Sequence, residues 1–347
     1  MFDGHSGPVF CCALNGGGDI AVTGGEDDKA YLWTTNSNGQ ESQILQQLDF
    51  QDSVIDVGFN CDETLIACID MEGFVQVISS SNYEVVYDYD IGADINFIRW
   101  HPNDPDILLV GTQTDASYLL SIRDNSVKNL HGPGGDNPAG TFFSDGQRAV
   151  IGYENGIIRI WDINESRPIH TVRATSAHTD SVISLHVKHD DSLLASGSLD
   201  STAKLISPQS GKVVATLECG MREDKTVDKS NSVESLEFCK IHPILATGSL
   251  NGLLEIWDLH TSVKKSVFEC EQGISKVGWC PKTPHLICVA GLDGNLRIVD
   301  GRDGSLVSVE SGHQDQILDF SVASNNYTIL TCSGDGTSRV FNYDEFK

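Results

Sequence analysis

The chain has few basic residues: 23 Lys and Arg stand against 49 Asp and Glu among 347 residues, a formal net charge of −26. Nucleic-acid-binding proteins normally present a basic surface, so direct binding of DNA or RNA is not expected. An acidic surface attracts basic partners, although surplus carboxylates can also serve solubility alone. Composition leaves both interpretations open.

Long apolar runs are also missing. No stretch reaches the roughly 18 residues that a membrane helix needs. The first five residues, MFDGH, contain neither the basic nor the apolar segment of a signal peptide. We therefore expect no membrane span and a place in the cytoplasm, with the nucleus as a second compartment.

The motifs of common enzymes are absent as well. The sequence has no P-loop and no glycine-rich dinucleotide motif between a strand and a helix, and its ten Cys form no CxxC pair or metal-like spacing. Free cysteines in reducing compartments behave as small buried hydrophobes, so we expect structural thiols. The sequence thus predicts no catalytic, cofactor or metal site and a protein that is not an enzyme.

The sequence does contain one motif that is repeated eight times. A small-residue strand end is followed by an Asp or Asn turn and an alternating strand, as in residues 151–162 (IGYENGIIRIWD) and 247–258 (TGSLNGLLEIWD). The strand closes about every 44 residues, which is the period of a β-propeller blade. The closing positions are Trp33, Ile78, Leu120, Trp161, Ile206, Trp257, Val299 and Phe341.

Period-2 alternation between Gly, Asn and Asp turns predicts antiparallel strands, four to a repeat. We therefore predict an all-β, eight-bladed propeller forming a single domain over residues 1–347. The blades are expected at about 5–48, 49–90, 91–130, 131–175, 176–218, 231–270, 271–310 and 311–347. Residues 219–230 form an insertion between blades five and six, either on the binding face or as a tolerated solvent loop.

Three repeats carry a His 28 residues before the closing position, together with a Ser or Thr four residues before the turn Asp. Such His–Ser/Thr–Asp sets resemble a catalytic triad. Repetition favours a structural hydrogen-bonded tetrad instead. An enzyme needs one active site, whereas a set of hydrogen bonds that stabilises a blade is needed in many blades. The sets are His5, Thr23, Asp27 and Trp33; His178, Ser196 and Asp200; and His313, Thr331 and Asp335.

These repeats resemble the WD40-repeat family. Four segments resemble more narrowly angio-associated migratory cell protein and its yeast relative, a WD-repeat ribosome-assembly chaperone: 21–30 (AVTGGEDDKA), 148–162 (RAVIGYENGIIRIWD), 231–236 (NSVESL) and 316–320 (QILDF). The resemblance implies an eight-bladed propeller whose acidic face holds the basic N-terminal segment of a large-subunit ribosomal protein. The animal relatives imply a broader role in cell migration and signalling.

The two ends of the chain depart from that family. In WD propellers the outer strand of the last blade usually comes from the N-terminus, yet only four residues precede His5. The final six residues, NYDEFK, offer almost no fourth strand. We therefore expect the last blade to lack its outer, closing strand and to leave an exposed edge, as in a truncated form of a longer protein.

The function predicted is a monomeric, non-catalytic scaffold that binds a basic protein segment, a ribosomal protein in the first instance, and chaperones it during ribosome biogenesis. The partner-binding residues predicted on the turn face are Phe10, Glu26, Asp52, Asp70, Asp94, Glu154, Asp180, Glu234 and Asp315. Each acidic residue could equally be a solvated loop charge. A substrate receptor of a cullin-type ubiquitin ligase is the alternative, because residues 299–302 (VDGR) are a degenerate form of the WDxR motif of such receptors.

Overall fold

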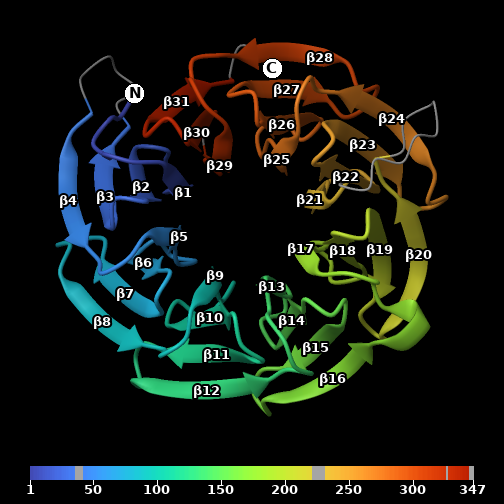
Figure 1. The fold of residues 1–347 in the computed structure, drawn as a ribbon, viewed down its shortest axis with the longest axis horizontal. Coiled ribbons are helices and arrows are strands. Elements are labelled where there is room, and N and C mark those ends of the chain that lie inside the picture. The colour runs from blue at the N-terminus through green and yellow to red at the C-terminus, as the bar shows by residue number, and fades with distance from the viewer. Residues whose placement is uncertain (36–41, 221–230, 326, 344–347) are drawn as a thin grey trace.

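The computed structural model describes residues 1–35, 42–220, 231–325 and 327–343. These residues form eight antiparallel sheets arranged as blades around a central axis (Figure 1). Seven sheets have four strands and the last has three, so the predicted eight-bladed all-β propeller with a short last blade is confirmed. Besides strands, the described residues form one 3-10 turn, η1 (Ala174–Ser176), and no helix among them is able to cross a membrane.

The strands of each blade run in chain order from the axis outward and are here called A to D. Blades 1 to 4 consist of β1 (Val9–Leu14), β2 (Ile20–Gly25), β3 (Lys29–Thr34) and β4 (Ile44–Asp49); β5 (Val54–Phe59), β6 (Leu65–Asp70), β7 (Phe74–Ser79) and β8 (Val85–Asp90); β9 (Ile95–Trp100), β10 (Ile107–Thr112), β11 (Ala116–Ser121) and β12 (Ser126–His131); and β13 (Ala139–Phe142), β14 (Arg148–Gly152), β15 (Ile158–Asp162) and β16 (Arg167–Val172).

Blades 5 to 8 follow the same order around the ring. They consist of β17 (Val182–Val187), β18 (Leu194–Ser198), β19 (Thr202–Ser207) and β20 (Lys212–Glu218); β21 (Val233–Phe238), β22 (Ile244–Ser249), β23 (Leu253–Asp258) and β24 (Lys264–Glu269); β25 (Ile274–Trp279), β26 (Leu286–Gly291), β27 (Leu296–Asp300) and β28 (Leu306–Glu310); and β29 (Ile317–Val322), β30 (Thr328–Ser333) and β31 (Ser338–Asn342). Each predicted closing position lies in a third strand.

The core lies between neighbouring blades rather than inside any one of them. Second strands such as β22 are buried along their whole length, whereas the outer strand β24 alternates between exposed and half-buried residues. Val22 and Leu32 of blade 1, for example, pack with Ile66 and Ile78 of blade 2. A single blade could not bury these side chains, so the ring is the unit that makes the core.

The predicted Asn-Gly and Asp-Gly turns join the second and third strands. Gly156 has a φ of +78°, a conformation that glycine adopts without steric cost. A Cβ atom at this position would also lie 2.1 Å from the carbonyl oxygen of His178 in the next blade. This turn therefore needs glycine both for its backbone angle and for close contact between blades 4 and 5.

The ring closes between blades 8 and 1 through the N-terminus. Phe2 exchanges two backbone hydrogen bonds with Ser338 of β31, of 2.8 and 2.9 Å. Counting back from the closing positions, Ser338 corresponds to Ala30 and Ala203, which pair with the buried outer-strand residues Leu48 and Leu217. Phe2 therefore takes the place of the core residue of an outer strand, and in the part of the chain that the structure describes it forms one rung on the edge that the sequence predicts to be open.

Candidate protein-interaction site

The antiparallel order brings two sets of loops to one end of the ring. The loops that join strand D of one blade to strand A of the next lie at the same end as the B–C turns, and we call this end the D–A face. The opposite end, with the A–B loops and the C–D turns, is the A–B face. The eight acidic residues predicted to bind a partner all come from D–A loops, B–C turns or the strand ends beside them.

Most of these side chains reach the surface. Five of the predicted acidic residues are exposed: Glu26, Asp94, Glu154, Asp180 and Asp315. Asp52 and Glu234 are half-buried, as is Phe10, the predicted aromatic anchor in β1. The carboxylates of Asp180 and Asp315 each accept a bond from the backbone N–H of the following residue, at 2.8 and 2.7 Å. That bond fixes the direction in which each carboxylate points.

Asp70 differs from the other predicted residues, because it is fully buried. Its Oδ1 accepts the backbone N–H groups of Gly73 and Phe74 at 3.0 and 2.8 Å, so it holds the turn after β6 in shape. Burial also raises the pKa of its carboxyl group. Its assignment as a contact on the partner-binding surface is therefore corrected: Asp70 is a turn residue.

The strands around the axis line a central cavity of about 500 Å³. Its wall includes Glu234, Glu237 and Asp319, together with Arg99 and Lys276. The cavity is therefore polar and carries charges of both signs, and the D–A face is the end at which Glu234 enters it.

Three carboxylates of the inner strands bind backbone N–H groups of the next blade. Asp56 accepts the N–H of Ile98 at 2.9 Å, Asp319 that of Cys12 at 3.1 Å and Glu237 that of Trp279 at 2.9 Å. The innermost strand of each blade has one edge without a neighbouring strand. These carboxylates therefore accept hydrogen bonds from backbone N–H groups that the sheet does not pair. The repeat pattern does not predict this set; the signal for it is an acidic residue at the third or fifth position of an inner strand.

Two members of this set have cations beside them. Arg99 donates to Asp56 at 2.8 Å, and Lys276 contacts Asp319 at 2.5 Å. Burial opposes charge on Lys276, but Asp319 outweighs it and raises the pKa of the lysine. Among the described residues Glu237 has no Lys or Arg within ion-pair distance; His186 lies 3.9 Å away, and Lys240 and Lys276 act on it from further off. Burial raises the pKa of Glu237 to about 7, and burial together with Lys240 lowers that of His186 to about 4.

The three predicted histidine sets form the same network. In blade 1, His5 Nδ1 lies 2.8 Å from Asp27 and Nε2 lies 3.0 Å from Thr23 Oγ1, which also accepts the indole N–H of Trp33 at 3.3 Å. The His–Asp distances are 3.0 Å for His178–Asp200 and 3.1 Å for His313–Asp335; the distance from Nε2 to the hydroxyl is 2.8 Å for both Ser196 and Thr331.

The geometry of these sets favours a structural role. The hydroxyl-bearing residues Thr23, Ser196 and Thr331 are fully buried, so no substrate can reach a nucleophile. Burial lowers the pKa of His5 and of His313. Although burial opposes it, backbone N–H groups and Thr337 lower the pKa of Asp335 to about 2. A neutral imidazole held by an ionised carboxylate joins the loop before strand A to the B–C turn of its own blade.

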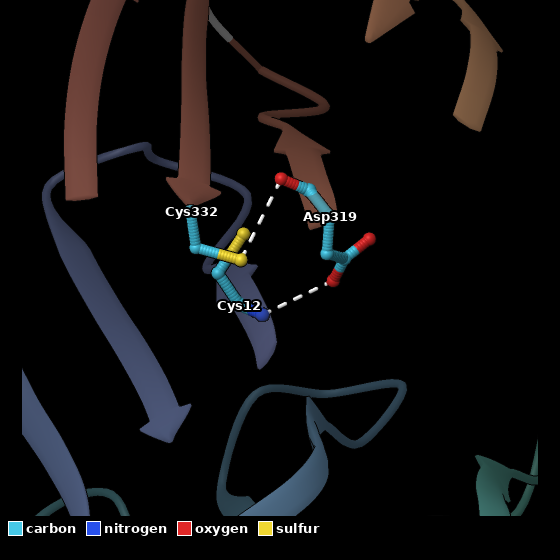
Figure 2. A group of neighbouring side chains, drawn as sticks. All are labelled: Cys12, Asp319 and Cys332. Atoms are coloured by element: carbon cyan, nitrogen blue, oxygen red, sulfur yellow. Dashed lines mark hydrogen bonds between the residues drawn. The ribbon is translucent and has the colours of Figure 1, made fainter. Parts of the chain in front are cut away.

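A group that no local spacing could reveal lies at the seam between blades 8 and 1. Cys12, Cys332 and Asp319 bring two sulfur atoms and a carboxylate oxygen within 4.8 Å of one another (Figure 2). The thiol of Cys332 contacts the Asp319 carbonyl at 3.6 Å and that of Cys12 the Leu330 carbonyl at 3.8 Å. Burial raises the pKa of both thiols. Asp319 also pairs with Lys276 and accepts the N–H of Cys12. Each atom of the group that could bind a metal therefore already has a protein partner, and we interpret the group as a contact across the seam between blades 8 and 1.

The degenerate WDxR segment lies at the end of β27 on the A–B face. Asp300 accepts the backbone N–H of Arg302 at 2.8 Å and pairs with its guanidinium group. The Arg302 side chain is 62% exposed, so it projects from the rim while its charge is partly matched.

Comparison with known proteins agrees with this architecture. The WD40 family (WD domain, G-beta repeat) matches residues 1–34, 167–207 and 304–342. The chain is 36% identical to human angio-associated migratory cell protein, in an alignment that covers 97% of this chain and 78% of that protein.

Solved structures with the same fold include two of Sqt1. The Saccharomyces cerevisiae protein superposes with a TM-score of 0.87 at 20% identity, covering 98% of this chain and 97% of that one. Sqt1 of Chaetomium thermophilum, bound to the N-terminus of the ribosomal protein L10, gives 0.88 at 20% identity, covering 99% and 98%. At this identity the likeness concerns the fold. The sequence match is closer, and the chain belongs to the WD40-repeat proteins, in the family of angio-associated migratory cell protein.

Proposed function

We propose that this protein is a non-catalytic scaffold that binds a basic protein segment on its D–A face. The observation that carries the proposal is the charge of the loops there. In the described D–A loops, the B–C turns and the N-terminal segment before β1, the one basic residue is Arg173. The acidic residues of the same segments are Asp3, Glu26, Asp27, Asp28, Asp52, Glu72, Asp94, Asp115, Asp136, Glu154, Asp180, Asp200, Glu271, Asp293, Asp315 and Asp335.

Several of these carboxylates accept hydrogen bonds within turns or within the histidine sets. The exposed ones still contribute to the electrostatic field of the D–A face. Summed charges of one sign around a concave opening raise the local concentration of oppositely charged ligands and speed their association. A flexible segment rich in Lys and Arg is the ligand that fits such a field. Glu26, Glu154 and Asp180 are the contacts we expect first, because they are exposed and come from blades 1, 4 and 5.

The identity of the partner is proposed from the relatives. The Sqt1 structure with the N-terminus of ribosomal protein L10 supports a large-subunit ribosomal protein as the basic partner. In that role the scaffold would act as a chaperone, keeping the segment from aggregation and from unspecific pairing with RNA before assembly. The ten unpaired cysteines, nine of them buried, fit a reducing compartment such as the cytoplasm.

Fluorescence anisotropy with a labelled peptide from the L10 N-terminus tests the proposal. We expect binding that weakens steeply between 50 and 300 mM salt, because screening removes the attraction of exposed charges. The triple variant Glu26→Gln, Glu154→Gln, Asp180→Asn should bind about tenfold more weakly, at a few tenths to one kcal/mol for each exposed charge. The matched variant Asp62→Asn, Glu63→Gln, Glu165→Gln on the A–B face should bind like the unchanged protein. Absent or salt-insensitive binding would contradict the proposal.

A further inference from the structure

The A–B face is not uniform in charge. The A–B loops of blades 1 to 5 (residues 15–19, 60–64, 101–106, 143–147 and 188–193) each carry at least one Asp or Glu. In the corresponding loops of blades 6 to 8, over residues 239–243, 280–285, 323–325 and 327, there is no Asp or Glu, and the charged residues are Lys240 and Lys282. On a chain of net charge −26, the A–B loops of this sector are therefore basic, while the C–D turn of blade 7 beside them adds one charge of each sign, Arg302 and Asp303.

Both lysines are available to a ligand. Lys240 and Lys282 are exposed, and neither has an ion pair among the described residues. The three blades are neighbours on the ring, in the yellow-to-red part of Figure 1. The two ammonium groups therefore belong to one sector of the A–B face.

A pocket of about 370 Å³ opens in the same sector. Its apolar wall includes Trp279 and Phe320, which are almost fully buried, and the rim residue Ile241, whose exposure is 62%. Pro281 and Pro284, which flank Lys282 in its loop, complete the rim. What sets Ile241 apart from other exposed apolar residues is its position beside a pocket with aromatic walls, because contiguous apolar surface commonly binds partners.

The polar groups of the pocket wall are already engaged. Glu237 accepts the backbone N–H of Trp279, and Lys276 pairs with Asp319 and donates to the Phe320 carbonyl at 2.9 Å. The pocket therefore offers apolar contact inside, while the unpaired charges nearest to it among the described residues are those of Lys240, which lines the pocket, and Lys282, which lies between the rim residues Pro281 and Pro284.

We propose that this sector is a second interaction site, which binds an acidic protein segment carrying a large apolar side chain. The side chain would fill the pocket between Trp279, Phe320 and Ile241, and flanking carboxylates would pair with Lys240 and Lys282. Apolar anchors surrounded by a polar rim are the usual arrangement of binding hot spots. The site lies at the opposite end of the ring from the D–A face and does not depend on the function proposed there.

A protein segment fits better than a nucleic acid. Two lysines neutralise few phosphates, and the acidic loops of the other five blades on this face would repel a polyanion that extends beyond the sector. A short peptide can place its carboxylates only where the lysines are, and the pocket gains from burying an apolar group.

Binding of a designed peptide tests the proposal directly. The probe is a labelled 12-residue peptide with a central Leu-Phe pair flanked by Glu residues, titrated with the full chain. We expect at least tenfold weaker binding by the Lys240→Glu, Lys282→Glu double variant and at least fivefold weaker binding by Ile241→Ser. The Lys128→Glu, Lys212→Glu variant, which changes exposed lysines on β12 and β20, should stay within twofold of the unchanged protein. Hydrogen exchange should show protection by the peptide at residues 237–241 and 279–284.

Several results would overturn the proposal. They are a peptide with Ala-Ala in place of Leu-Phe binding equally well, protection confined to other blades, equal losses in the control variant, or displacement of the peptide by a short single-stranded RNA. Because the substituted residues are exposed, all variants should fold, and circular dichroism checks this. The L10 peptide should bind the Lys240→Glu, Lys282→Glu variant at least as tightly as the unchanged protein, which separates failure of this site from failure of the D–A face.

Discussion

Glu237 holds two blades together at the cost of burying a carboxyl group. It accepts the backbone N–H of Trp279, while its nearest cationic candidate, His186, is neutral at physiological pH because burial and Lys240 lower its pKa to about 4. Asp56 and Asp319 do the same work with Arg99 and Lys276 beside them. Among the three inner-strand carboxylates described above, Glu237 is thus the one for which charge is least compensated.

This difference predicts a pH-dependent stability. Burial raises the pKa of Glu237 to about 7 in the folded protein, above its value of about 4.3 when unfolded. The folded state therefore holds the proton more tightly, so the contribution of Glu237 to stability is complete below pH 4 and is lost as the pH rises through 7. Glu237→Gln mimics the protonated form and should raise the free energy of unfolding by about 2 to 4 kcal/mol at pH 8, with a much smaller effect at pH 4.5.

Denaturant unfolding of both proteins at several pH values measures this effect. Glu165→Gln, on an exposed turn, is the matched control and should follow the unchanged protein at every pH. A constant difference between Glu237→Gln and the unchanged protein from pH 4.5 to 8 would show that Glu237 titrates normally.

At the scale of elements, Phe2 is the residue that joins the N-terminal segment to the last blade among the described residues. Phe2 forms one rung on β31, and its ring stacks on Trp33 with the ring centroids 4.6 Å apart. It also meets Tyr31 edge-on and belongs to the apolar cluster that joins blade 1 to Leu330 and Cys332. One side chain therefore does for blade 8 what a residue such as Leu48 does for blade 1.

Phe2→Ala should accordingly destabilise the seam far more than its place near the chain end suggests. Truncating a buried Phe typically costs 3–5 kcal/mol, and relaxation near the terminus should bring the loss to about 3 kcal/mol. Hydrogen exchange should accelerate first in β31 and β3. Met1→Ala, which changes the neighbouring exposed side chain, should leave exchange unchanged. Uniform acceleration around the ring would count against a local role for Phe2.

The elements themselves could be predicted from the sequence, because each repeat carries its own alternation and its own turn residues. The closing positions and the histidine sets depend on spacings within one repeat, so they too can be predicted from the sequence. Asp70 was misplaced because the turn pattern does not show whether a carboxylate faces solvent or its own backbone. The Cys12–Cys332 contact, the Phe2 rung and the inner-strand carboxylates depend on how separate blades meet, which no local pattern encodes.

For the whole molecule, closure of the ring decides how it unfolds. Blades that touch only their neighbours can lose cooperativity in an open array, where terminal repeats fray first. Here blade 8 is joined to blade 1 by the Phe2 rung, by Asp319 on the Cys12 N–H and by the apolar cluster around Leu330. A closed ring has no terminal blade, so opening any seam must disturb two blades at once.

We therefore expect one unfolding transition for the 347 residues, as the proposed single domain requires. Tryptophan fluorescence samples the ring widely, because Trp33, Trp100, Trp161, Trp257 and Trp279 lie in blades 1, 3, 4, 6 and 7. Its denaturant midpoint should coincide with that of far-UV circular dichroism. In Phe2→Ala the seam is weakened, so the two curves should separate as blades 8 and 1 open before the others. Separate transitions in the unchanged protein would instead mean that the ring behaves as an open array, and that the seam contacts contribute little to its cohesion.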